Sequence, residues 1–109
     1  MRRRTLAGAA LATLATPTVL RAQGTWPDQP VRLVVPFAAG GPTDIPARLI
    51  ADELSKQLPQ RVVVENRTGA GVVVGSDVVA KAPKDGSVFL YTTIAHATLR
   101  AIFAKLPFD

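Results

Sequence analysis

The chain has 109 residues, of which 48% are hydrophobic, so its length allows one small domain with a compact core. Its net charge is +5, but four of the thirteen basic residues lie before residue 23, and no acidic residue precedes Asp28. The remaining charge is nearly balanced and shows no basic face with interleaved aromatic residues, so we expect no nucleic-acid partner.

Residues 1–22 have the pattern of a secretory signal peptide. Arginines at positions 2 to 4 precede an Ala/Leu-rich run over residues 6–15, and Pro17 and Ala22 follow. This apolar run is shorter than the about 20 residues that a membrane span needs. An ordinary core or amphipathic helix is the alternative. With cleavage expected after Ala22 and no cysteine for a disulfide or lipid anchor, we predict an exported, periplasmic protein.

The first predicted unit is a strand, a turn and a helix. Val31–Val35 is almost entirely apolar, which is typical of a parallel strand covered on both faces. A glycine-rich turn over residues 37–42 follows. Either Thr43 or Asp44 is the predicted N-cap of a helix that runs to about Leu58. The expected apolar side of this helix comprises Ala47, Leu49, Ile50, Leu54 and Leu58.

The same unit then repeats along the chain. A strand over residues 61–65 and a second glycine-rich turn precede a predicted helix over residues 72–82. A strand over residues 88–92 and a helix over residues 97–106 come next. This alternation predicts an α/β fold, a three-layer parallel sheet. The pattern stops where a fourth strand is expected, so we expect a truncated protein or a fragment.

Both glycine-rich turns, 37–42 and 66–71, lie where a predicted strand ends and a predicted helix begins. In an open α/β sheet, ligands bind at this edge because the loops diverge and leave a crevice. Helix N-termini expose unpaired N–H groups that favour anions, and glycine lets the backbone approach a ligand closely. The two turns therefore predict an anion-binding corner. Glycines that serve only tight turns and close packing are the alternative.

A cofactor interpretation rests on Gly69–Gly75, which has the form G-x-G-x-x-x-G. This spacing is one residue longer than the dinucleotide fingerprint and follows the second strand instead of the first. No acidic residue follows at the end of the next strand, and no nucleoside-triphosphate motif is present. We therefore predict no cofactor, and keep a small Rossmann-type nucleotide- or phosphate-binding enzyme domain as the alternative function.

Four polar residues are individual candidates for ligand contact. Asp44 is either a helix cap that needs no ligand, or a group that orients a bound water or meets an amine or hydroxyl. His96, the only histidine, is either a ligand donor or a surface or capping residue. Thr92 and Thr93 are candidate hydroxyl donors. A single histidine without cysteine gives no metal-ligand spacing and no Ser-His-Asp set, so we predict neither a metal nor catalysis.

Two segments carry a recognisable pattern, VRLVVPFAAGGPTD at residues 31–44 and VVVENRTGAG at residues 62–71. With KDG at residues 84–86 and KLPFD at residues 105–109, they resemble motifs of the tripartite tricarboxylate transporter substrate-binding (Bug-type) family. The resemblance spans residues 26–109 in order and spacing.

The resemblance implies a periplasmic binding protein of type II, a two-lobed Venus flytrap that is not an enzyme. Such a protein holds a small carboxylated solute, such as a di- or tricarboxylate, between its lobes and delivers it to membrane permease subunits. Residues 23–109 would form the N-terminal part of lobe 1, without the second lobe.

Carried over by position, the resemblance also implies the ligand contacts. Val72 departs from the family, which commonly has glycine there, and its bulkier side chain would narrow or reshape the pocket. Family members are much longer than this chain, so a truncated fragment that binds nothing is a further alternative. The implied contacts are Phe37, Ala38, Ala39, Gly40, Gly41, Thr43, Asp44, Gly69, Ala70, Gly71, Thr92, Thr93 and His96.

Overall fold

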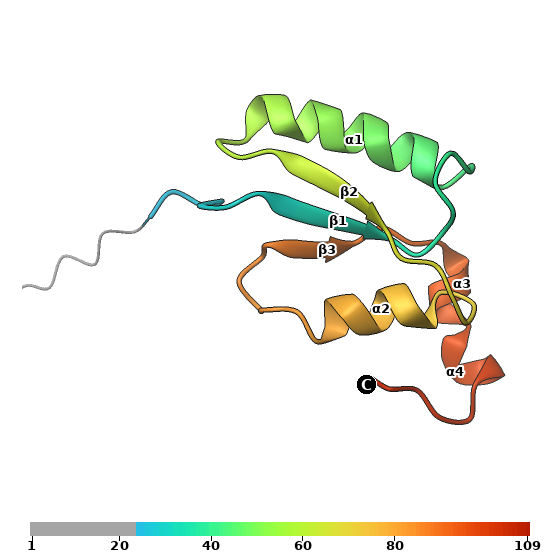
Figure 1. The fold of residues 1–109 in the computed structure, drawn as a ribbon. Helices are drawn as coiled ribbons and strands as arrows, with labels where there is room; N and C mark the ends of the chain where they lie inside the picture. Colours follow the sequence, from blue (N-terminus) through green and yellow to red (C-terminus); the bar gives the residue numbers. More distant parts are fainter. Residues whose placement is uncertain (1–23) are drawn as a thin grey trace, which may run out of the picture.

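A computed structural model describes residues 24–109, so the predicted signal peptide lies outside the described residues. The elements along the chain are β1 (Val31–Val35), α1 (Asp44–Gln57), β2 (Val62–Asn66), α2 (Val73–Ala80), β3 (Val88–Leu90), α3 (Ile94–Ala97) and α4 (Leu99–Ile102). The strands form one parallel sheet in the order β2-β1-β3 (Figure 1). This confirms the predicted parallel α/β fold. No helix in this part of the chain is long and apolar enough to cross a membrane.

The strand order explains how the helices are layered. The connection from β1 to β2 goes to one side of the central strand, and the connection from β2 to β3 crosses to its other side. Because such crossovers are right-handed, the two connecting helices must cover opposite faces. Accordingly, α1 contacts β1 and β2, whereas α2 contacts β1 and β3 (Figure 1).

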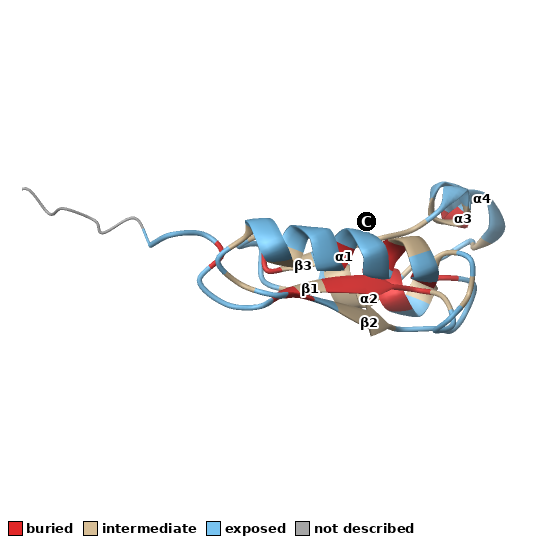
Figure 2. Cartoon of the chain, turned by 90° about the horizontal axis from the view of Figure 1, so that it is seen from above, coloured by how far each residue is buried: buried red, intermediate tan, exposed pale blue. Residues whose placement is uncertain are grey.

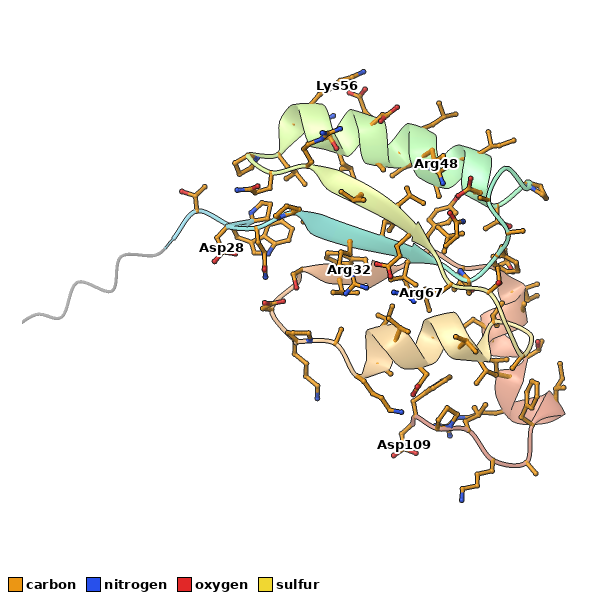
Figure 3. All side chains as sticks on the ribbon, viewed as in Figure 1. Asp28, Arg32, Arg48, Lys56, Arg67 and Asp109 are labelled. Carbon is orange, nitrogen blue, oxygen red and sulfur yellow. The ribbon has the colours of Figure 1, made fainter. Side chains whose placement is uncertain are left out.

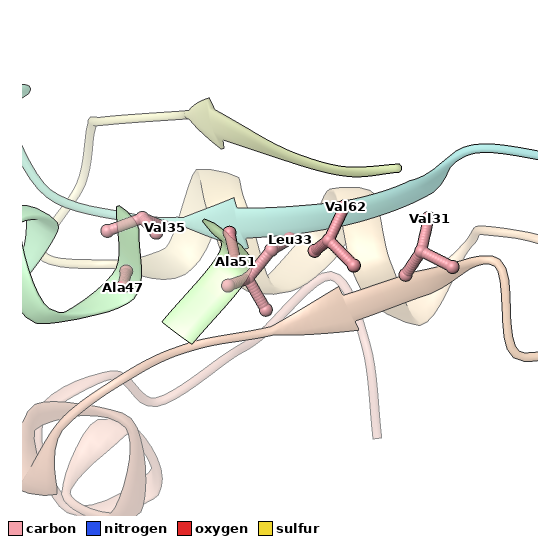
Figure 4. Packing of buried hydrophobic residues seen from close by; sticks show 6 residues of the cluster. All are labelled: Val31, Leu33, Val35, Ala47, Ala51 and Val62. Atoms are coloured by element: carbon pink, nitrogen blue, oxygen red, sulfur yellow. The ribbon is translucent and has the colours of Figure 1, made fainter. Parts of the chain in front are cut away.

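The main core lies between β1 and α1. Alternate residues of β1 point to the same face, so Val31, Leu33 and Val35 meet Ala47 and Ala51 of α1, with Val62 beside them (Figure 4). The small alanines let the helix approach the strand closely. Val34 points to the other face and is also fully buried. Figure 2 shows this contrast between a buried β1 and the exposed outer surface of α1.

Helix α1 has the predicted extent but only part of the predicted packing: Ala47 is in the core and Leu58, which follows the helix, packs against it. Leu49 and Ile50 were expected on its apolar side, yet they are 67% and 42% exposed, while Ala47 and Ala51 are buried. The helix faces the sheet with its small residues, and its larger aliphatic residues lie on the flank and the outer surface. Thr43 holds the N-cap position, as one of the two predicted candidates, but its side chain makes no capping hydrogen bond.

The C-terminal segment differs most from expectation. The predicted single helix over residues 97–106 is wrong: α3 begins earlier, at Ile94, and the chain turns at Thr98 before α4. Helix α3 begins there because the Thr93 hydroxyl accepts a hydrogen bond from the Ala95 N–H at 3.3 Å. Helix α4 stops where Phe103 becomes extended. Helix α2 and strand β3 are also shorter than predicted, so Thr92 lies in the loop beyond the strand.

Candidate functional site

Three loops meet at the carboxyl edge of the sheet: residues 36–43 after β1, 67–72 after β2 and 91–93 after β3 (Figure 1). We call them the carboxyl-edge loops. They contain every predicted ligand contact except Asp44, the first residue of α1, and His96, in α3. The parallel strands bring these residues together because all their carboxyl ends lie on one side.

Asp44 holds the first of these loops in place. Its side chain is almost completely buried, and its Oδ2 accepts from the Gly40 N–H at 2.8 Å and from Arg48 Nε at 2.7 Å. Gly40 has a φ of 78°, a conformation in which glycine has no steric penalty. The carboxylate therefore closes the turn that leads into α1 instead of capping the helix.

Asn66 joins this loop to the end of β2. Its Nδ2 donates to the Phe37 carbonyl at 3.0 Å and to Asp44 Oδ1 at 2.9 Å. Its Oδ1 accepts from Arg48 Nη2 at 3.0 Å, and Arg48 extends from α1 toward this edge (Figure 3). Sequence reasoning missed Asn66, although its position at the end of a predicted strand was a usable signal.

These contacts set the charge of Asp44. Hydrogen bonds from the Arg48 side chain, the Gly40 N–H and the Asn66 amide lower the pKa of Asp44 to about 2, against the opposing effect of burial. The carboxylate is thus ionised at neutral pH, and Arg48 compensates its charge. Its contact with a ligand stays a prediction, whereas its role in shaping the loop follows from the geometry.

The second loop is shaped by the backbone. Gly69, Ala70, Gly71 and Val72 all have positive φ, at 133°, 46°, 57° and 74°. A β-branched residue rarely adopts this conformation, and Val72 does so at the N-cap of α2 while only 4% exposed. Among residues 24–109, no acceptor is bonded to the N–H groups of these four residues. Successive backbone N–H groups next to a helix N-terminus form a concave site that suits an anion.

The third loop adds a hydroxyl group. The Thr92 Oγ1 is buried, yet it has no hydrogen-bond partner in the described part of the chain. A buried polar group without a partner is uncommon and costs free energy. Thr93, by contrast, uses its hydroxyl to cap α3. The structure thus separates the two predicted donors, and Thr92 is the one whose hydroxyl is not otherwise engaged.

His96 connects α3 to the start of α2. Its Nδ1 lies 2.9 Å from Ser76 Oγ, and its ring stacks on Phe108 with centroids 6.2 Å apart. Sequence reasoning missed Ser76, because only the fold brings together residues that lie 20 positions apart. Within the described range, no carboxylate binds this imidazole, and no group of three residues has the arrangement of a metal site. The contact between Ser76 and His96 therefore positions α3 against α2.

Comparison with known proteins gives a consistent result. The model of the tripartite tricarboxylate transporter family receptor matches residues 46–109. A protein of Pseudomonas sp. (strain P51), the UPF0065 protein in the tcbD-tcbE intergenic region, is 41% identical over 108 residues, which is 99% of this chain and 32% of that protein. The chain thus spans about a third of the length of this relative.

Solved structures agree with this match. The periplasmic binding protein BugD is 51% identical, with a TM-score of 0.57 over 60% of this chain and 22% of its own. MatC (Rpa3494) from Rhodopseudomonas palustris, solved with bound malate, is 46% identical, with a TM-score of 0.58 over 60% of this chain and 22% of its own. The sheet and its helices correspond to part of a lobe in these proteins.

Proposed function

Since this chain belongs to the tripartite tricarboxylate transporter receptor family, we propose that its carboxyl-edge loops form one wall of a binding site for a small carboxylate. In this proposal the protein is a non-enzymatic, periplasmic solute receptor, exported by residues 1–22. Residues 23–109 contribute part of one lobe, and the complete receptor hands its solute to membrane permease subunits.

The observation that carries the proposal is the set of unengaged donors at this edge. The N–H groups of residues 69–72 and the Thr92 hydroxyl have no partner among the described residues. Arg48 compensates the nearby Asp44 carboxylate, which limits repulsion of an incoming anion. Neutral donors grouped at a helix N-terminus are well suited to a carboxylate. The malate held by the similar MatC belongs to this ligand class.

Binding is best tested by NMR titration, because one wall of a site binds weakly and chemical shifts detect millimolar affinity. The ¹⁵N-labelled full chain would be titrated with malate, adipate, citrate and a neutral diamide. We expect saturable shifts of the amides of residues 69–72 and Thr92 with the carboxylates only. The amides of residues 84–86, at the opposite edge of the sheet, serve as the internal reference.

A matched pair of variants tests the hydroxyl. Thr92→Val removes the buried hydroxyl at nearly constant volume and should weaken carboxylate binding, whereas Thr98→Val, whose hydroxyl donates to the Ala95 carbonyl, should not. Shifts caused by nicotinamide nucleotides alone would favour the nucleotide-binding alternative. Carboxylate-induced shifts confined to other parts of the chain would refute the proposed site.

A further inference from the structure

Arg67 is the only charged residue in the carboxyl-edge loops. It begins the second loop, two positions before Gly69, and its carbonyl oxygen lies against the first turn of α2. An arginine at this place is well suited to contact a bound carboxylate, because its guanidinium group matches a carboxylate in charge and geometry. In the structure, however, Arg67 Nε donates to a carboxylate of the chain itself, Glu65 Oε1, at 2.5 Å.

The alternation of side chains along β2 explains this orientation. Successive residues of a strand point to opposite faces of the sheet. Val64 and Asn66 lie on the face toward α1, where Val64 packs against the core and Asn66 holds the first loop. Glu65 and Arg67 therefore share the other face, on the side of α2. The Arg67 side chain thus extends back along β2 instead of forward into the loop.

Glu65 has a second partner, which compensates its charge without Arg67. Arg32, on the neighbouring strand, donates to Glu65 Oε2 from Nε at 2.7 Å and from Nη2 at 2.6 Å, and the two arginines lie side by side (Figure 3). The Glu65 side chain is 24% exposed, whereas that of Arg67 is 52% exposed. The bond to Arg67 is therefore not needed to compensate Glu65, but it fixes the direction of the Arg67 side chain.

From this arrangement we infer that Glu65 is a positioning residue of the proposed carboxylate site, and that it holds the Arg67 guanidinium group away from the bound solute. This inference rests on the proposed function. With Arg67 withdrawn, neutral donors hold the solute, namely the N–H groups of residues 69–72 and the Thr92 hydroxyl. Since salt weakens the interactions of exposed charges, the affinity of such a site depends little on ionic strength.

Removal of the Glu65 charge tests the inference. Glu65→Gln nearly keeps the size of the side chain, and Glu53→Gln is the matched control, because Glu53 also binds a cation, Lys56, but on the exposed side of α1. The ¹⁵N-labelled full chain would be titrated with malate. We expect Glu65→Gln to bind malate about threefold more tightly than the natural chain, the effect of one exposed ion pair, and Glu53→Gln to leave the affinity unchanged. The gain should disappear at high salt.

The source of this gain is identified by Arg67→Gln. In the natural chain this substitution should change malate affinity little, because Arg67 does not contact the solute. In the Glu65→Gln background it should remove the gain, which a double-mutant cycle measures. The NMR signal of the Arg67 Nε–H group is a second readout. We expect malate to shift it in Glu65→Gln but not in the natural chain.

Four outcomes would overturn the inference. Glu65→Gln, shown to be folded by circular dichroism, binds malate no more tightly than the natural chain, or the gain persists in the double variant. Arg67→Gln weakens binding in the natural chain as much as it does in the Glu65→Gln background. Malate shifts the Arg67 Nε–H signal of the natural chain, a measurement that needs no variant.

The proposed function fails in a different way. If no carboxylate shifts the amides of residues 69–72 in the natural chain or in any variant, both the site and the role of Glu65 are refuted. If these amides shift with malate in the natural chain but the affinity does not respond to Glu65→Gln, only the role of Glu65 is refuted.

Discussion

The loops after β1 and β2 lie side by side at the carboxyl edge, but different forces hold them. The first loop is fixed by a side chain: the Asp44 carboxylate gathers Gly40, Arg48 and Asn66. The second loop is fixed by its backbone, through four successive positive φ angles. The first loop should therefore respond to charge and pH, and the second to the shape of the residues it contains.

The largest effect is expected from Asp44→Ala. The substitution leaves the Gly40 N–H and the Asn66 amide without their acceptor in a buried region and leaves Arg48 without its counter-charge. We expect Tm to fall by on the order of 10 °C in a thermal melt. Asp52→Ala is the matched control, since Asp52 is exposed on the same helix, and it should change Tm little. Equal losses in both variants would contradict the buried role of Asp44.

Acid titration tests the same carboxylate without removing it. Since the folded-state pKa of Asp44 is about 2, below its ordinary value of 3.8, ionised Asp44 stabilises the fold above about pH 4, and this contribution is lost as pH falls toward 2. The stability difference between the natural chain and Asp44→Asn should therefore narrow over this interval in urea melts.

Other carboxylates also affect how the stability of each protein depends on pH, but they do not affect the stability difference between the natural chain and Asp44→Asn. The pKa of Glu65 and that of Asp85 are also lowered. For Glu65, burial is the largest single effect and raises the pKa, but the hydrogen bonds and charges of Arg32 and Arg67 together outweigh it; for Asp85, hydrogen bonds from Ser87 lower the pKa. Their contributions are common to both proteins and cancel on subtraction. A difference that stays constant from pH 5 to pH 2 would show that Asp44 does not titrate as the geometry requires.

The next largest loss of stability is expected from a substitution at Gly75, where α2 packs against the ends of β1 and β2. A Cβ added there would lie 2.6 Å from Pro36 Cβ and 2.9 Å from the Arg67 carbonyl oxygen, and neither atom belongs to a flexible chain end. Helix propensity alone favours alanine by about 1 kcal/mol, but we expect Gly75→Ala to lose about 1–3 kcal/mol through overpacking. Gly24→Ala, where nothing lies within 4 Å, should be neutral in the same urea melts. A gain in stability would refute the close contact.

The sequence predicted the parts of the fold that depend on local pattern. Apolar runs and glycine-rich turns identified all three strands and the first two helices. The strand order was not predicted, because it depends on which side each crossover takes. The start of α3 at Ile94 and the break at Thr98 were both missed. The spacing of apolar residues does not reveal that Thr93 caps a short helix there, which ends at Thr98. In α1, Ala47 was correctly predicted on the core side, but Leu49 and Ile50 were wrongly placed there, because close packing on β1 favours the alanines.

The candidate site shows a similar division. The glycine turns and the threonines at the end of β3 could be proposed from sequence because strand ends converge at one edge. The bonds of Asn66 to Asp44 and of Ser76 to His96 join different elements, and only folding brings their atoms together. The positive φ of Val72 was also hidden, since valine is an improbable residue for that conformation.

The smallest change in stability is expected at Val72. It most directly tests whether the second loop is fixed by its backbone conformation instead of by a side chain. Both Val72→Gly and Val72→Ala remove buried apolar surface, but only glycine also relieves the left-handed backbone, whose cost for other residues is about 1–2 kcal/mol. We therefore expect the glycine variant to be more stable than the alanine variant by about 1 kcal/mol.

Val74, exposed within α2, provides the reversed control. There the backbone is helical, so alanine should be more stable than glycine by about 1 kcal/mol. If alanine were also the better residue at position 72, the positive φ would not control this loop, and the proposed anion site would lose the backbone conformation on which it rests. The opposite order at the two positions would show that the conformation of the second loop is imposed by the fold despite the valine.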